Sequence, residues 1–164
     1  SVSEAKLKAL SDIVDSAAED GKKLVIIARF LPEIDAILRM LEKKAIGYSI
    51  ISGEIKDRDE QVRRFQTDPD TTVFVGQIAT AGLGITLTAA DTMAFYSLDY
   101  SMSNFEQAKA RIHRVGQRCP CTYLYLVAAG TVDEKVLQAL IDKADLARIL
   151  IDEYRAGRNP FQTK

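Results

Sequence analysis

Residues 107–117 carry the arrangement best suited to chemistry in this chain. They read Gln-Ala-Lys-Ala-Arg-Ile-His-Arg-Val-Gly-Gln. On a helix that turns about 100° per residue, Gln107, Arg111 and Arg114 fall within a stripe about 60° wide. Because a guanidinium is planar, permanently charged and able to grip phosphate through two hydrogen bonds, this stripe is a candidate surface for a polyphosphate whose charge changes during a reaction.

The alternative is that the stripe is only a solvated helix face, which is the commoner role of paired arginines. The setting favours a functional role. Gly116 is expected to stop the helix, and a β-type run over residues 92–97 leads into it through a loop that ends near Asn104. A strand, a loop and an arginine-bearing helix are typical of the nucleotide-facing edge of an α/β sheet. His113 is interpreted as holding the following loop, because no nucleophile or carboxylate is spaced to work with it.

Length and composition indicate an ordinary globular domain. The 164 residues fit a single domain over residues 1–164, with 157–164 as a frayed tail. Hydrophobic residues make up 47% and charged residues 27%. The sequence has neither an apolar run long enough to cross a membrane nor a signal-peptide pattern. We therefore expect no membrane partner, and a cytoplasmic location in a bacterium or phage-infected cell or a nuclear one in a eukaryote.

The net charge argues against nucleic-acid binding through a bulk positive field, and the cysteine spacing argues against a structural zinc site. The net charge is −1, so no bulk positive field would attract nucleic acid, and any such contact must be local. Cys119 and Cys121 lack the second ligand pair that a structural zinc needs, and His113 is the single histidine. We therefore predict reduced thiols and no metal site made by this chain.

Helical and strand patterns alternate along the chain. Helices are predicted from Ser3 to about Gly21, from Pro32 to Gly47, from Lys56 or Asp57 through Phe65, from about Asn104 to Gly116, and from Thr131 onward. Strands are predicted at 24–28, 48–51, 72–75, 92–97 and 122–128. This order predicts an α/β domain with a mainly parallel sheet and helices on both faces. Ligands of such sheets bind beyond the carboxyl ends of the strands.

A loop with two glycines, Gly82 and Gly84, follows the strand at 72–75. Small residues there would let the backbone approach a phosphate, although a tight turn is the commoner meaning of this pattern. The sequence contains no Gly-x-x-x-x-Gly-Lys-Ser/Thr loop and no Asp-Glu pair at a strand end that could hold magnesium. A domain that offers arginines without a lysine-bearing phosphate loop is best understood as half of a site, which lends its cations to a triphosphate bound elsewhere.

With these residues identified, the chain resembles the second RecA-like lobe of superfamily 2 helicases, and most closely the Snf2 group of double-stranded DNA translocases. Four blocks carry the resemblance: 23–30 resembles motif IV, 49–65 the next block, 73–90 motif V and 107–117 motif VI. The pattern Gln-Ala-x-x-Arg-x-His-Arg-x-Gly-Gln is highly specific. The resemblance implies a RecA-like three-layer α/β/α fold.

The resemblance also implies roles for individual residues. Arg111 and Arg114 would be arginine fingers that reach an ATP held, with Mg²⁺, mainly by a preceding N-terminal lobe. Gln107, Gly82 and Gly84 would lie near that nucleotide.

Double-stranded DNA is the second implied partner, and the residues expected near its backbone are Arg29, Gly53, Gln77 and Thr80. The sequence departs from the family here, because the usual motif V run Ser-Thr-Arg-Ala-Gly-Gly is replaced by residues 77–82, which lack the arginine. Residues 83–91 look more like the annealing-helicase branch than the chromatin remodellers, and a phage or bacterial source fits that likeness.

The sequence thus predicts the C-terminal ATPase lobe of a DNA-dependent translocase, which should hydrolyse almost no ATP by itself. One alternative is an ATP-independent module of the same fold that binds nucleic acid or protein. Another is a self-contained nucleotide-using enzyme. The helix from Thr131 either runs back toward the partner lobe or packs on its own sheet.

Overall fold

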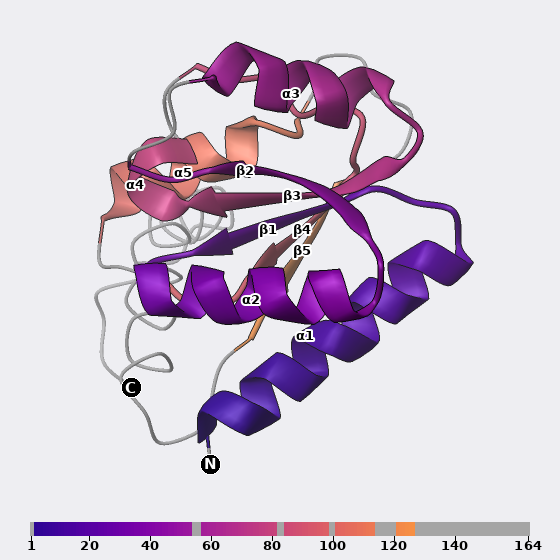
Figure 1. The fold of residues 1–164 in the computed structure, drawn as a ribbon. Helices are drawn as coiled ribbons and strands as arrows, with labels where there is room; N and C mark the ends of the chain where they lie inside the picture. The colour runs from indigo at the N-terminus through magenta and orange to yellow at the C-terminus, as the bar shows by residue number, and fades with distance from the viewer. Residues whose placement is uncertain (1, 54–56, 82–83, 99–100, 114–120, 127–164) are drawn as a thin grey trace, which may run out of the picture.

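The computed structural model describes residues 2–53, 57–81, 84–98, 101–113 and 121–126. Within these ranges the chain forms a parallel five-stranded sheet of order β2-β3-β1-β4-β5 (Figure 1). The strands are β1 (Leu24–Ala28), β2 (Gly47–Ile51), β3 (Thr71–Gln77), β4 (Thr92–Phe95) and β5 (Thr122–Tyr125). The predicted parallel sheet is therefore confirmed.

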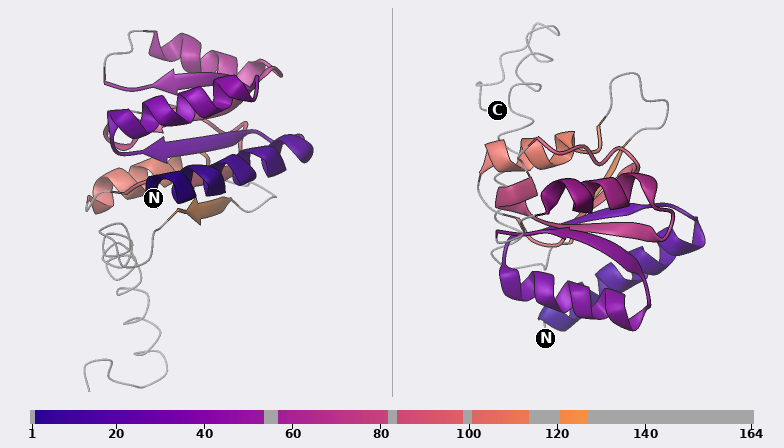
Figure 2. Two further views of the ribbon diagram at one scale, coloured as in Figure 1. Left: turned by 60° about the horizontal axis from the view of Figure 1, so that its bottom comes forward. Right: turned by 45° about the horizontal axis from the view of Figure 1, so that its top comes forward.

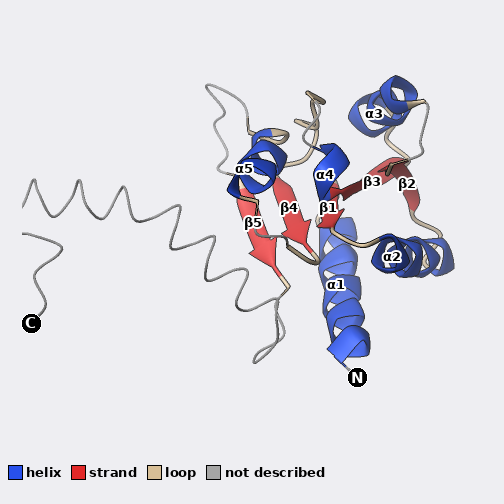
Figure 3. Ribbon diagram, turned by 90° about the vertical axis from the view of Figure 1, so that its left-hand side faces the viewer, coloured by secondary structure: helices blue, strands red, loops and turns tan. Residues whose placement is uncertain are grey.

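Helices cover both faces of this sheet (Figures 2 and 3). One face carries α1 (Val2–Glu19) and α2 (Leu31–Lys43), and the other carries α3 (Arg58–Thr67), α4 (Ile78–Ala81) and α5 (Met102–Ala110). The domain is thus a three-layer α/β/α sandwich, as the resemblance implied. Parallel strands require crossover connections, and α2, α3 and α5 are helices that return the chain from one strand to the start of the next.

Strand β1 lies at the centre and is buried on both faces. Because successive strand residues point to opposite faces, its side chains divide between two hydrophobic clusters. Leu24 and Ile26 pack in the cluster that contains Leu10 of α1, whereas Val25 and Ile27 pack in the cluster that contains Phe65 of α3. The unbroken apolar run of β1 is the sequence signature of this double burial.

Two helix starts on the carboxyl edge of the sheet are fixed by local hydrogen bonds. At the start of α2, the amide of Phe30 donates to Glu33 Oε1 at 3.1 Å, and a proline occupies the first turn. At the start of α5, Ser101 Oγ accepts a hydrogen bond from the amide of Asn104 at 3.1 Å. Both caps hold the chain as it leaves a strand, which is where the candidate site lies.

Several predicted boundaries are wrong. Strand β3 continues to Gln77, β4 ends at Phe95, and α5 runs from Met102 to Ala110 instead of from about Asn104 to Gly116. The carbonyl of Arg111 accepts a hydrogen bond from the amide of Leu87 at 2.9 Å, so a distant loop occupies an acceptor at the end of α5. Gln107 therefore lies within α5, Arg111 is its C-cap, and position 114 falls outside the described residues.

Other predictions fall outside the described residues. These are the structural surroundings of Gly82, Arg114 and Cys119, the end of the strand predicted through 128, the helix predicted from Thr131 and the tail at 157–164.

Candidate functional site

The carboxyl edge of the sheet brings together three of the four residues expected near nucleic acid. The side-chain amide of Gln77, at the end of β3, donates from Nε2 to the carbonyl of Arg29 at 3.3 Å. Its Oε1 accepts a hydrogen bond from the amide of Gly53 at 3.3 Å. One amide side chain thus links the exits of β1, β2 and β3. The side chain of Thr80, the fourth residue, lies outside the described residues, although its backbone is part of α4.

A buried serine extends this linkage to β4. The amide of Arg29 donates to Ser97 Oγ at 2.7 Å, and Ser97 Oγ in turn donates to Glu33 Oε1 at 2.6 Å. Ser97 is 3% exposed. The adjacent strands β1 and β4 send the chain to opposite faces of the sheet, and such a divergence point is where open α/β sheets bind ligands.

Sequence reasoning missed Ser97 and Glu33 as members of this edge. Glu33 had a readable signal, because a glutamate three residues after a helix start is half of a capping box. Ser97 had only the weak signal of a polar residue at the end of an apolar strand.

Arg29 combines a fixed backbone with a cationic side chain. Its guanidinium lies over the ring of Phe30, 4.9 Å from the centroid. Phe30 and Leu31 are the exposed large hydrophobic residues of the described chain, at 52% and 51% exposure. The edge therefore presents a cation and an apolar pair side by side, and the cation suits contact with a polyanion.

The segment after β3 contains the loop that the sequence resemblance predicts to lie near a nucleotide. Gly84 adopts φ 75°, a left-handed conformation that favours glycine, and an added Cβ would meet no atom within 4 Å. The space beside this glycine is an open hollow of about 500 Å³ that is also lined by Ile85 and Thr86 and by Arg58 and Arg63 of α3. Gly84 thus lies at an accessible surface, as a loop that approaches a phosphate requires.

Arg111 ties this loop to the end of α5. Its Nη1 donates to the carbonyl of Ile85 at 3.3 Å, and its Nε donates to the carbonyl of Gln107 at 2.8 Å. The remaining N–H groups of the guanidinium take part in neither of these two hydrogen bonds. The Arg111 side chain is half-buried, and Gln107 is exposed, with its Nε2 donating to Ser103 Oγ at 3.2 Å. The structure therefore places Arg111, Gln107 and the Gly84 loop together at one end of α5.

The opposite side of α5 is anchored on β5. Tyr123 Oη donates to the carbonyl of Lys109 at 3.1 Å, and Cys121 Sγ donates to the carbonyl of Ile112 at 3.6 Å. Burial, together with the neighbouring Cys121 thiol, raises the pKa of Tyr123 to about 12. Tyr123 therefore keeps its proton and its hydrogen bond at neutral pH.

Helix α3 presents charged side chains to solvent. Arg63 and Glu60 form an exposed ion pair with an Nη2–Oε1 distance of 2.6 Å. Their hydrogen bonds lower the pKa of the Glu60 carboxyl and raise that of the Arg63 guanidinium. We assign this pair no role in the site.

The described ranges contain neither a metal-binding cluster nor a helix that could cross a membrane. No group of three histidine, cysteine or acidic side chains is arranged there to bind a metal ion. None of the helices in these ranges combines the length and apolar character needed to span a bilayer.

Comparison with known proteins gives the family. Residues 5–116 match the helicase conserved C-terminal domain. The chain is 35% identical over 152 residues to the chromatin-remodeling ATPase INO80 of Cryptococcus neoformans, a match that covers 92% of this chain and 9% of that protein. It is 33% identical over 148 residues to the mouse protein of the same name, covering 89% of this chain and 10% of that protein. The chain thus spans about a tenth of the length of these relatives.

A solved structure has the same fold. The crystal structure of the C-terminal part of the Fun30 ATPase domain matches with a TM-score of 0.76 and 21% identity, over 93% of this chain and 54% of that one. The two INO80 relatives are eukaryotic chromatin-remodeling ATPases, and they lend no support to an annealing-helicase branch or to a bacterial or phage source. These matches, together with the parallel sheet, show that the chain belongs to the helicase C-terminal domain family, as a second RecA-like lobe of the Snf2 type.

Proposed function

We propose that this chain is the C-terminal half of an ATP-driven motor that moves on double-stranded DNA, and that it completes an ATP site held mainly by an N-terminal lobe. The observation that carries the proposal is the position of Arg111. It joins the end of α5 to the loop of Gly84, and the sequence contains no phosphate-binding lysine loop. A cation donor of this kind acts on a nucleotide that another module binds.

The residues present fit one side of a nucleotide. Arg111, with Arg114 as a further candidate, would contribute guanidinium charge, and Gln107 and the glycines Gly82 and Gly84 would line the approach. ATP with Mg²⁺ would supply the phosphoryl group that is transferred to water. Arginine charge placed beside that group is typically worth about 10³ to 10⁵ in rate, because it offsets charge that develops in the transition state.

The second part of the proposal concerns DNA. Arg29, Gly53 and Gln77 are linked at the strand exits, and Thr80 follows in α4. The Arg29 guanidinium at this edge suits a contact to the phosphates of a DNA strand, which positions a protein without reading sequence. Because the relatives are named as chromatin-remodeling ATPases, we infer that the whole protein works on chromatin in a eukaryotic nucleus.

The ATP part is tested by joining this chain to its N-terminal lobe and measuring DNA-stimulated ATP hydrolysis. We expect Arg111→Ala and Arg114→Ala each to lower turnover by about 10³ or more while ATP binding persists. Lys22→Ala removes an exposed cation at the amino edge of the sheet and should leave turnover unchanged. The chain alone should hydrolyse almost no ATP. Normal turnover in both arginine variants, or rapid hydrolysis by the chain alone, would overturn this part.

The DNA part is tested with the same two-lobe protein. Arg29→Ala should weaken binding of duplex DNA and reduce the slope of log affinity against log salt by about one. Lys22→Ala again serves as the control. An unchanged slope in Arg29→Ala would remove Arg29 from the DNA contacts.

A further inference from the structure

Helices α1 and α2 enclose an open groove that the proposed function does not use. They lie on the sheet face away from α3, α4 and α5, and the groove between them has a volume of about 560 Å³. Each helix lines it with residues spaced i, i+3, i+4 and i+7, the spacing that places side chains along one helix face. The groove therefore follows one face of the first half of α1 and of the second half of α2.

The floor of the groove is apolar. Leu7 of α1 and Ala36 and Met40 of α2 line it, and all three side chains are only partly buried. Leu7 and Met40 also pack against the hydrophobic cluster on this side of the sheet, which anchors the floor. Methionine adapts its shape readily and is common on surfaces that bind apolar side chains.

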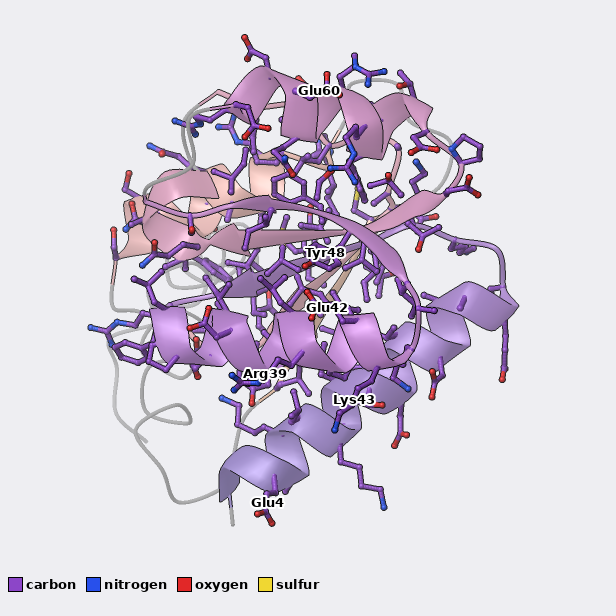
Figure 4. The ribbon with its side chains drawn as sticks, viewed as in Figure 1. Glu4, Arg39, Glu42, Lys43, Tyr48 and Glu60 are labelled. Atoms are coloured by element: carbon purple, nitrogen blue, oxygen red, sulfur yellow. The ribbon has the colours of Figure 1, made fainter. Side chains whose placement is uncertain are left out.

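The rim of the groove is cationic. Lys8, Arg39 and Lys43 are exposed, and among the described residues no carboxylate lies within 4.0 Å of their charged nitrogens. Figure 4 shows Arg39 and Lys43 on the side of α2 that is turned toward α1, with Glu4 near the beginning of α1. Lys44 also lines the groove, and it pairs with Asp15 at 2.8 Å. Cations thus outnumber carboxylates along the rim.

These features identify the chemistry of the occupant. We propose that this groove, which we call the α1–α2 groove, binds an amphipathic helix of a partner protein whose apolar stripe contacts the floor and whose aspartates and glutamates flank that stripe. A groove between two helices with an apolar floor accepts the apolar face of a third helix. A DNA backbone would match the cations but would leave the apolar floor without a complementary surface, because phosphate contacts are polar.

The test uses this chain and a synthetic probe, a helical peptide of about 18 residues with leucines at helical spacing flanked by glutamates. A peptide of identical composition in scrambled order, which forms no apolar stripe, is the matched control. Binding is measured by fluorescence anisotropy at low and high salt. We expect the amphipathic peptide to bind with a Kd of about 100 µM or tighter and more weakly at high salt, and the scrambled peptide to bind at least about tenfold more weakly.

Variants locate the binding. Arg39→Gln combined with Lys43→Gln should weaken the amphipathic peptide at least about fivefold, and Met40→Ser should weaken it at any salt concentration. Lys22→Gln, an exposed lysine outside the groove, should leave affinity unchanged, and circular dichroism should confirm that each variant is folded. The proposal would be overturned if the amphipathic peptide did not bind, if both peptides bound equally, or if Lys22→Gln lost as much affinity as the groove variants. It would also be overturned if duplex DNA displaced the peptide, or if the chain associated with itself and these variants abolished that association. Because the assay contains neither ATP nor the N-terminal lobe, its result does not depend on the proposed function.

Discussion

The backbone amide of Arg29 donates to the hydroxyl of Ser97 at 2.7 Å, although the two residues are 68 positions apart. The same hydroxyl donates to Glu33 at the start of α2. Ser97 therefore joins the exits of two adjacent parallel strands to the helix that follows one of them. The position of Arg29 at the carboxyl edge thus depends on a residue from the other half of the domain.

Ser97→Ala should lower the free energy of unfolding by about 1–3 kcal/mol, because it removes a partner from a backbone amide and from a carboxylate in a partly buried setting. Ser103→Ala is the matched control, since Ser103 is exposed and its hydroxyl accepts from the exposed side chain of Gln107, and it should change stability by less than about 0.5 kcal/mol. Urea denaturation of both variants measures the difference. Equal losses in the two would mean that the buried linkage adds nothing to stability.

Gly84→Ala should lower the free energy of unfolding by about 1–2 kcal/mol, because φ 75° is unfavourable for a residue with a Cβ. The cost is conformational, since the added Cβ would meet no atom within 4 Å. Gly84→Asn should be milder, because asparagine tolerates the left-handed region better than alanine. Thermal denaturation ranks the three proteins, and a ranking with asparagine below alanine would contradict this explanation.

Lys23→Met should destabilise the domain by about 1–2 kcal/mol. Lys23 Nζ donates to the carbonyls of Phe65 and Asp68 at the end of α3, the latter at 2.7 Å, and lies over the Phe65 ring. Methionine keeps the apolar stem but removes the donors and the charge. Lys22→Met, at an exposed neighbouring lysine, is the control for denaturant unfolding, and it should be nearly neutral.

Tyr123 should make the stability of the domain sensitive to alkaline pH. Its pKa is about 12 in the folded state, against 10.0 for an unperturbed tyrosine, so the folded state retains the proton longer. This contribution is fully present below pH 10 and is lost as the pH rises toward 12. Absorbance titration should reveal a late-ionising tyrosine that Tyr123→Phe removes.

The same variant tests the anchor of α5. Tyr123→Phe loses the hydrogen bond to the carbonyl of Lys109, which should cost about 1 kcal/mol at neutral pH and weaken the pH dependence above pH 10. Tyr48→Phe is a control for the α5 anchor alone, because the hydroxyl of Tyr48 donates to Glu42 at 2.8 Å, and this bond also raises the pKa of Tyr48. An alkaline stability profile that is identical in wild type and Tyr123→Phe would contradict the assignment.

The amino-acid sequence by itself determined the elements with strong local signals. The apolar run at 24–28 predicted a strand buried on both faces, Pro32 predicted a helix start, and alternation of the two element types predicted the parallel sheet. These signals depend on neighbours along the chain, so they can be read without the fold. The motif at 107–117 predicted the family in the same way.

Tertiary structure alone decided where elements end and which residues meet. Helix α5 ends at Ala110 and not at Gly116, and the carbonyl of Arg111 is taken by the amide of Leu87, which no pattern within the helix reveals. Ser97 and Glu33 join the carboxyl edge through a hydrogen bond that spans 64 positions. Local propensity fixes the type of an element, whereas its ends and its polar partners depend on hydrogen bonds that exist only after distant segments have packed.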